Sequence, residues 1–220
     1  MSTILITGAS RGIGAACARR FARDGHRMAL LARPSADLTS LASRLDALAV
    51  ECDLADEHQI RAALERVDRS LGPVDVLVNN AGIVHRHDVV GHPTADWDRV
   101  MAVNLRAPFL LARGVLPGML ARRSGRILNI SSISATSGTP GLAAYCASKA
   151  GLLGFTRALS QEVKAAGVVV VAVAPGSVDT DMLVGSGFTP DMSPEDVADV
   201  VAFLATAPRA VTGASVEVFG

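Results

Sequence analysis

Short apolar runs alternate along the chain with longer segments whose apolar residues recur every three or four positions. The runs predict seven strands, at residues 3–7, 27–32, 48–52, 74–78, 127–130, 168–174 and 214–218. The segments between them, such as 13–21, 57–70 and 196–204, have the spacing of amphipathic helices. Residues 168–174, VVVVAVA, predict a central strand buried on both faces. The alternation indicates an α/β protein: a single-domain, doubly wound, seven-stranded parallel sheet with helices on both faces and its ligand site at the carboxyl ends of the strands.

One predicted helix contains two prolines. One face of this helix is marked by Trp97, Val100, Met101 and Leu105, and Asn104 lies among them, where an Asn is mildly unfavourable. We expect Pro108 and Pro117 to bend or interrupt it.

The turn after the first predicted strand reads TGASRGIG, with glycines at 8, 12 and 14. Gly8 permits a tight turn, Gly12 lets a pyrophosphate approach the backbone, and Gly14 allows close packing of helix and strand. The helix that follows presents free N–H groups and the positive end of its dipole to phosphates. We therefore predict a dinucleotide site here rather than an ordinary strand-to-helix turn.

The end of the second strand indicates which dinucleotide fits. An acidic residue there would bind the ribose 2′-hydroxyl of NAD, but the aligned residue is Ala32, followed by Arg33. Arg33 can pair with a 2′-phosphate, and Arg11 in the glycine turn could reach the same group. Each arginine alone could be a solvated surface charge; together, with the acid missing, they predict NADP(H) in preference to NAD(H).

Polar residues also follow the third and fourth predicted strands. Asp53 could accept a hydrogen bond from an adenine amino group or cap the next helix, and the sequence leaves both open. Residues 79–82, NNAG, could tie neighbouring strands together and leave space for a cofactor.

Three further polar residues follow the fifth predicted strand. Ser132 follows it, and Tyr145 and Lys149 lie one turn apart on a predicted Ala-rich helix. A phenol has a pKa near ~10, and a neighbouring cation would lower that pKa toward the range useful for acid–base catalysis. Ser132 could donate a hydrogen bond to the same substrate oxygen. Such pairs are usually surface decoration, so the interpretation depends on all these residues meeting at one edge of the sheet.

Composition narrows the alternatives. The 21 Lys and Arg balance the 21 Asp and Glu, so nothing indicates nucleic acid as a partner. Apolar runs such as 168–174 are too short to span a membrane, and no basic leader precedes the first strand. Three widely spaced cysteines suit a reducing cytoplasm without structural disulfides, with Cys17 in the core and Cys146 near a ligand.

Three histidines lie close together in the loop after the fourth predicted strand. His85, His87 and His92 have Asp88 among them, which makes a metal site conceivable. The loop is polar and no further ligand follows at a useful spacing, so we predict no metal.

Taken together and in order, these motifs resemble the short-chain dehydrogenase/reductase family in its compact single-domain form, nearest to 3-oxoacyl-[acyl-carrier-protein] reductases. The likeness covers nearly the whole chain and rests on four motifs: TGxxxGxG at 7–14, NNAG at 79–82, Tyr145-x-x-x-Lys149 with Ser132, and Pro175-Gly176 with Thr180. It implies a Rossmann fold and a catalytic group of Asn104, Ser132, Tyr145 and Lys149.

The resemblance also implies a role for each residue. Tyr145 protonates the carbonyl oxygen and Ser132 polarises the carbonyl. Lys149 lowers the pKa of Tyr145 and holds the nicotinamide ribose, while Asn104 positions a water that relays protons. The predicted cofactor residues are Gly8, Ser10, Arg11, Gly12, Ile13, Gly14, Arg33, Asp53, Leu54, Asn80, Ala81, Gly82, Tyr145, Lys149, Pro175, Gly176, Val178 and Thr180.

Two departures from the family concern the substrate. Between Thr180 and the last predicted helix lies only a short linker, where relatives often fold a pair of lid helices. This predicts a more open pocket that admits bulky or carrier-bound ketones. The chain ends at Gly220, where relatives usually have a longer Gly-Gly tail that contributes to tetramer contacts.

We therefore predict an NADPH-dependent oxidoreductase that interconverts a ketone or aldehyde and an alcohol. A 3-oxoacyl thioester reductase and a general secondary-alcohol dehydrogenase using NAD remain open within this class. A non-catalytic NAD(P)-binding sensor or scaffold is the alternative outside it, and a sugar-nucleotide epimerase would need a larger C-terminal region. We expect a cytoplasmic homodimer or homotetramer, formed through the helices that hold Asn104 and Tyr145, with a small-molecule or carrier-bound carbonyl substrate and no nucleic-acid or membrane partner.

Overall fold

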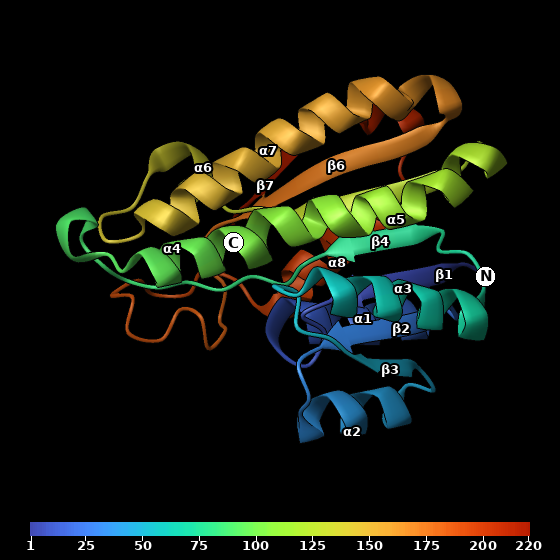
Figure 1. Cartoon of the computed structure of the whole chain (residues 1–220), viewed down its shortest axis with the longest axis horizontal. Helices are drawn as coiled ribbons and strands as arrows, with labels where there is room; N and C mark the ends of the chain where they lie inside the picture. Colours follow the sequence, from blue (N-terminus) through green and yellow to red (C-terminus); the bar gives the residue numbers. More distant parts are fainter.

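All seven strands pair in parallel in one sheet with helices on both faces, in a computed structural model that describes residues 1–220 (Figure 1). The strand order is β3-β2-β1-β4-β5-β6-β7. The chain therefore builds outward from β1 in one direction and then from β4 in the other. The strands are β1 (Thr3–Thr7), β2 (Arg27–Ala32), β3 (Leu48–Glu51), β4 (Val76–Asn79), β5 (Gly125–Ile130), β6 (Val168–Pro175) and β7 (Ser215–Val218).

Two layers of helices cover the sheet. Helices α1, α2 and α8 contribute to the hydrophobic core on one face, and α3, α5 and α7 to the core on the other. Figure 1 shows α3, α5 and α7 side by side in front of the strands. The helices are α1 (Gly12–Arg23), α2 (Ala36–Arg44), α3 (Glu57–Leu71), α4 (Thr94–Met101), α5 (Ala107–Arg122), α6 (Ser134–Ser137), α7 (Ala143–Val163) and α8 (Pro194–Thr206).

Alternate residues of the inner strands enter opposite cores. In β1, Ile4 and Ile6 pack into the core beneath α1 and α8, and Leu5 packs into the other. In β6 every residue is buried, as the run of valines predicts. Cys17 is also buried in the core, as expected, and this burial raises the pKa of its thiol to about 12.

The predicted strands are found with ends shifted by up to two residues. The largest shifts are at β5, which starts at Gly125 instead of 127, and at β4, which spans Val76–Asn79 instead of 74–78. Asn79 belongs to β4 because it pairs in register with Asn129 of β5. The amide motif thus begins within the sheet rather than after it.

The proline-containing helix is not broken. Helix α4, the π-helical segment η2 (Ala102–Arg106) and α5 form a continuous stretch. Pro108 has no N–H to donate to the Asn104 carbonyl, and the wide turn at η2 lies where its ring would crowd that carbonyl. Pro117 lies inside α5 without interrupting it, and a bend at Pro117 stays a prediction. Buried residues on both sides of Pro117, such as Val115 and Met119, anchor both halves of α5 in the core.

This continuous helix, Thr94–Arg122, is long and apolar enough to cross a membrane by length and composition. However, 56% of its most apolar window is buried inside the protein, as is usual for a core helix.

Candidate active site

The strand order puts a switch point between β1 and β4, where doubly wound sheets bind ligands at the carboxyl ends of the strands. Strand β1 lies between β2 and β4, so the loops that follow β1 and β4 lead to opposite sides of the sheet. The predicted residues lie in the loops at this edge or directly after a strand: Gly8 after β1, Arg33 after β2, Asp53 beyond β3, Asn80 after β4, Ser132 beyond β5 and Gly176 after β6.

The glycine turn is packed as the sequence predicts. Gly8 adopts a φ of +63°, and a Cβ added at Gly14 would lie 2.3 Å from the Gly8 carbonyl oxygen. Asn80 Nδ2 donates to the Thr7 carbonyl oxygen at 2.9 Å, which ties the end of β4 to this turn. No side chain fits at positions 8 and 14 without displacing the backbone, so the first turn of α1 lies directly against the strand ends.

The loop after β6 reaches over the same turn. A Cβ at Gly12 would lie 3.2 Å from Cγ2 of Thr180, and Gly12 has a φ of +53°. A pyrophosphate bound against this turn would face the N–H groups at the N-terminus of α1. The glycines thus fit a dinucleotide on geometry as well as on sequence.

The two arginines predicted for a 2′-phosphate differ in their surroundings. Arg33 is exposed beside the buried Ala32 at the end of β2. Arg11 is also exposed and forms an ion pair with Asp181 at 3.1 Å. Arg33 is therefore the better placed of the two, because Arg11 would first have to leave Asp181.

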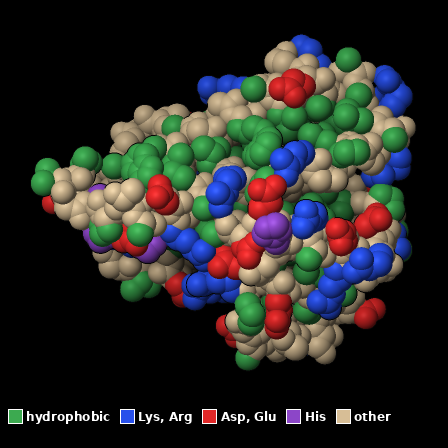
Figure 2. Space-filling view, viewed as in Figure 1, with side chains coloured by type: hydrophobic (Ala, Val, Ile, Leu, Met, Phe, Trp, Pro, Cys, Tyr) green, Lys and Arg blue, Asp and Glu red, His purple; other side chains and the backbone are tan.

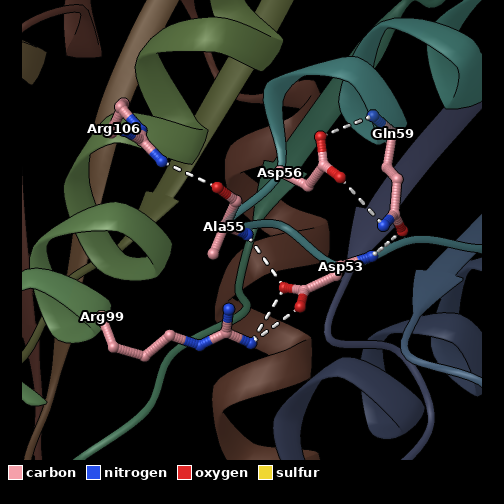
Figure 3. A network of polar contacts seen from close by, with 6 residues as sticks. All are labelled: Asp53, Ala55, Asp56, Gln59, Arg99 and Arg106. Atoms are coloured by element: carbon pink, nitrogen blue, oxygen red, sulfur yellow. Dashed lines mark hydrogen bonds and ion pairs between the residues drawn. The ribbon is translucent and has the colours of Figure 1, made fainter. Parts of the chain in front are cut away.

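The carboxylate of Asp53 accepts hydrogen bonds from neighbouring residues of the protein (Figure 3). Arg99 Nη2 donates to both carboxylate oxygens of Asp53 at 2.9 Å, and the Ala55 N–H donates at 3.0 Å. Burial alone would raise the pKa of Asp53, but these donors hold it below its ordinary value. The cap of α3 is Asp56, which accepts from the His58 N–H at 2.8 Å, so of the two alternatives left open the one in which Asp53 caps the helix is excluded. A contact between Asp53 and adenine stays a prediction.

A buried chain of hydrogen bonds connects β4, β5 and α7. Asn79 Nδ2 donates to Asn129 Oδ1 at 2.8 Å, and Asn129 Nδ2 donates to Thr156 Oγ1 at 2.8 Å. The predicted tie between neighbouring strands is therefore present, but it needs Asn129 and Thr156, which the sequence did not single out. Both are polar residues within otherwise apolar segments, and that was the available signal.

Lys149 and Tyr145 lie together at the start of α7. The Lys149 side chain is almost fully buried, and its Nζ lies 5.7 Å from the centre of the Tyr145 ring. Lys149 Nζ donates to the Ile130 carbonyl oxygen at 2.7 Å, and Ser131 Oγ donates to the Lys149 carbonyl oxygen at 3.0 Å. The end of β5 thus holds the lysine from both its side chain and its backbone.

The pKa shifts differ from the expectation. Burial raises the pKa of the Tyr145 phenol above its ordinary value, and the hydrogen bond with Ser132 offsets this only in part. Burial also lowers the pKa of Lys149 to about 8. The net shift of the Tyr145 pKa is thus upward, because desolvation outweighs the hydrogen bond with Ser132, and a lowering of this pKa by Lys149 stays a prediction.

Asn104 is fully buried, and its side chain links the loop after β4 to helix α7 by hydrogen bonds. Its Oδ1 accepts from the Ile83 N–H at 2.9 Å, and its Nδ2 donates to the Ile83 carbonyl at 2.9 Å and to Ser148 Oγ at 3.1 Å. Ser148 Oγ in turn donates to the Tyr145 carbonyl at 2.7 Å. The side chain is thus committed to protein partners, and the expectation that Asn104 positions a water stays a prediction.

The linker after Thr180 contains no helix before α8 begins at Pro194. Val184 and Phe188 are 76% and 57% exposed, so apolar side chains border this edge without a lid. The short linker is as predicted, and the openness of the pocket stays a prediction. The other predicted cofactor residues lie at the same edge: Ser10 and Ile13 at the start of α1, Leu54 after β3, Ala81 and Gly82 after β4, Pro175 at the end of β6 and Val178 beyond it.

A protein family, known reductases and a solved structure are all similar to this chain over most of its length. Residues 2–188, which include every strand-end residue described above, match the family described as short chain dehydrogenase. A 3-oxoacyl-[acyl-carrier-protein] reductase of Synechocystis sp. is 36% identical over 98% of this chain and 94% of its own. The corresponding reductase FabG of Rickettsia conorii is 40% identical over 99% and 95%. The crystal structure of a blue fluorescent protein from a metagenomic library, in complex with NADPH, has a TM-score of 0.92 and 39% identity, covering 100% of this chain and 96% of that one.

Proposed function

The chain belongs to the short-chain dehydrogenase/reductase family, and from this premise we propose that it reduces a ketone or aldehyde to an alcohol with NADPH. The observation that carries this proposal is the buried Lys149 beside Tyr145 and Ser132, at the edge of the sheet where the glycine turn lies. A lysine is rarely buried without a functional reason, because desolvation of its charge is costly. A sensor that only bound the dinucleotide could use Lys149 for the ribose but would not need the proton donor Tyr145 or the hydroxyl of Ser132 beside it.

Each residue of this group has its own role in the proposed reaction. NADPH, when bound at the glycine turn, supplies the hydride. Ser132 donates a hydrogen bond to the carbonyl oxygen, and Tyr145 transfers its proton to that oxygen as the negative charge develops. Tyr145 is protonated at neutral pH, as a proton donor must be, although its raised pKa makes the phenol a weaker acid in the protein alone. Lys149 uses one N–H on Ile130 and has others for the ribose hydroxyls and the phenol.

Tyr145→Phe tests the proposal directly. It removes the transferable proton and leaves the packing of the ring, so we expect turnover to fall by at least about 10²-fold. Binding of NADPH, followed by its fluorescence, should change little. Ser132→Ala should also lower turnover, and Ser137→Ala, an exposed serine of α6, serves as its matched control. Full activity of Tyr145→Phe would exclude the proposed proton donor.

NADP(H) is the preferred cofactor in this proposal. Support comes from Ala32 and Arg33 at the end of β2 and from the NADPH bound to the solved relative. Arg33→Asp places a negative charge against the 2′-phosphate, so the ratio of kcat/KM for NADPH over NADH should fall at least about tenfold, or about 1.4 kcal/mol. Arg44→Asp, at the exposed end of α2, makes the same charge change away from the pocket. An unchanged ratio in Arg33→Asp would place the 2′-phosphate elsewhere.

The substrate we propose is a 3-oxoacyl thioester, either carrier-bound or as a small-molecule analogue. Two of the relatives are 3-oxoacyl-[acyl-carrier-protein] reductases, and the exposed Val184 and Phe188 would suit an acyl chain. A panel of 3-oxoacyl thioesters and simple ketones, followed by NADPH oxidation, separates this substrate from a general secondary alcohol. The free cysteines support a reducing, cytoplasmic setting.

The assembly we propose is a homodimer or homotetramer. An apolar groove of about 640 Å³ lies along the outer face of the continuous helix and α7. Met101, Leu105, Phe109 and Phe155 line it, and Figure 2 shows hydrophobic side chains gathered over this region. Phe109 is 43% exposed there, which leaves apolar surface for a second copy to cover.

A further inference from the structure

A second cluster of titratable side chains lies outside the Tyr145 group. The loop after β4 brings His85 and His87 to Asp96, which belongs to the first turn of α4. His87 Nε2 lies 2.9 Å and His85 Nδ1 lies 3.5 Å from Asp96 Oδ2. The three ligand atoms all lie within 4.8 Å of one another. The acid in the cluster is thus Asp96, which the spacing along the sequence did not reveal, and not Asp88.

The backbone of the cluster is fixed from two sides. The His87 N–H donates to the Gly141 carbonyl at 3.0 Å, and His87 forms a parallel bridge with Leu142, which caps α7. The Asp96 N–H donates to the Pro93 carbonyl at 3.0 Å within the start of α4. The imidazoles and the carboxylate therefore meet because two elements of the fold hold them there.

The charge and exposure of the cluster suit a cation. The side chains of His85, His87 and Asp96 are 35%, 34% and 31% exposed, so they are partly desolvated yet open to an entering ion. Arg86 points away and donates to the Met182 carbonyl at 3.0 Å, so it adds no positive charge among the ligands. The cluster thus offers two imidazole nitrogens and a carboxylate oxygen as ligands, without a basic side chain among them.

His92 gives an independent sign that a ligand is needed. Its ring lies edge-on to that of His87, with centres 5.0 Å apart, and next to Trp97. Both ring nitrogens are shielded from solvent and have no hydrogen-bond partner. Buried polar atoms are nearly always paired, so an imidazole with two unpaired nitrogens beside a His–Asp cluster requires an explanation. A simple loop-anchoring bond between His87 and Asp96 explains neither His92 nor the approach of His85 to the same oxygen.

We propose that His85, His87 and Asp96 bind a divalent transition-metal ion, with zinc the best match. Two imidazoles and a carboxylate form a recurrent ligand set for zinc, and imidazole disfavours Mg²⁺ and Ca²⁺, which prefer oxygen ligands. A water molecule, or His92 after rotation of its ring, would complete four-coordination. The backbone of His87 is hydrogen-bonded to Gly141 and forms a bridge with Leu142. The ion would therefore stabilise the loop directly before Tyr145. The site does not depend on the proposed reaction.

The test uses the full chain, freed of metal by a chelator and then titrated with Zn²⁺ in competition with a chromophoric chelator. We expect one ion per chain, and a tetrahedral absorption spectrum when Co²⁺ replaces Zn²⁺. His87→Ala and Asp96→Asn should each weaken binding by at least about tenfold, because loss of even an outer-shell partner of a metal ligand costs that much. His58→Ala, an exposed histidine on α3, is the matched control and should bind as the unmodified protein does.

A second readout does not depend on dye competition. Zinc should raise the melting temperature of the unmodified protein and of His58→Ala, because a ligand that binds only the folded state stabilises it. The same addition should not raise it in His87→Ala. Substoichiometric binding would overturn the proposal. Equal affinity in His87→Ala and the unmodified protein would overturn it as well.

Discussion

At the scale of single residues, Lys149 has two opposing effects. Its buried ammonium serves the proposed reaction, yet the same burial lowers its pKa from 10.5 to about 8. Each pKa unit corresponds to about 1.4 kcal/mol, so the charged form costs the folded state up to ~3 kcal/mol. Its hydrogen bond to the Ile130 carbonyl does not prevent this lowering of the pKa. The residue that we regard as central to function therefore reduces stability at neutral pH.

Lys149→Met should reveal this cost. Between pH 8 and 10.5 the unfolded chain binds a proton that the folded chain has released, so the stability of the unmodified protein should rise with pH across that window. Below pH 8 both states are charged and the penalty is complete. We expect Lys149→Met to be more stable at pH 7 by about 1–3 kcal/mol in urea unfolding, with the difference shrinking by pH 10. A difference between the two proteins that does not change with pH would contradict this account.

At the scale of elements, the sequence predicted well wherever one periodicity dominated. The spans of β1 and β2 agree to the residue, and α1, Gly12–Arg23, extends the predicted helical segment 13–21 by one residue at its start and two at its end. The continuous helix with Pro108 and Pro117 was harder to predict. The local preference of proline against a helix interior conflicts there with the tertiary packing of the segment. Pro117 is unfavourable inside a helix, but the buried residues around it outweigh the loss of one hydrogen bond.

The location of the candidate active site was predictable from the sequence about as well as the helices and strands were. Residues that follow a strand end converge because parallel strands share an edge, so Gly8, Asn80 and Ser132 could be placed together from sequence. Contacts between distant loops could not. The pairing of Asp53 with Arg99 joins residues 46 positions apart, and no spacing rule brings them together. The direction of the Tyr145 pKa shift depends on burial, which requires the packed structure.

At the scale of the whole molecule, the groove beside Phe109 is the surface that association would cover. Phe109→Glu places a charge among apolar side chains that a second copy would bury, so we expect it to shift the protein toward monomer in sedimentation experiments. Val90→Glu introduces the same charge at a fully exposed position outside the groove and should leave the assembly unchanged. An unaltered assembly in Phe109→Glu would place the interface on another face.

The wide turn at η2 also affects how this chain tolerates changes in length. A π turn holds one more residue than the α turn it replaces, so a deletion within residues 102–106 can be absorbed with the flanking halves keeping their faces. The same deletion elsewhere in the helix would rotate all later residues by about 100° around its axis. Phe109 would then leave the groove, and Arg113 would lose Glu57, to which it now donates at 2.7 Å.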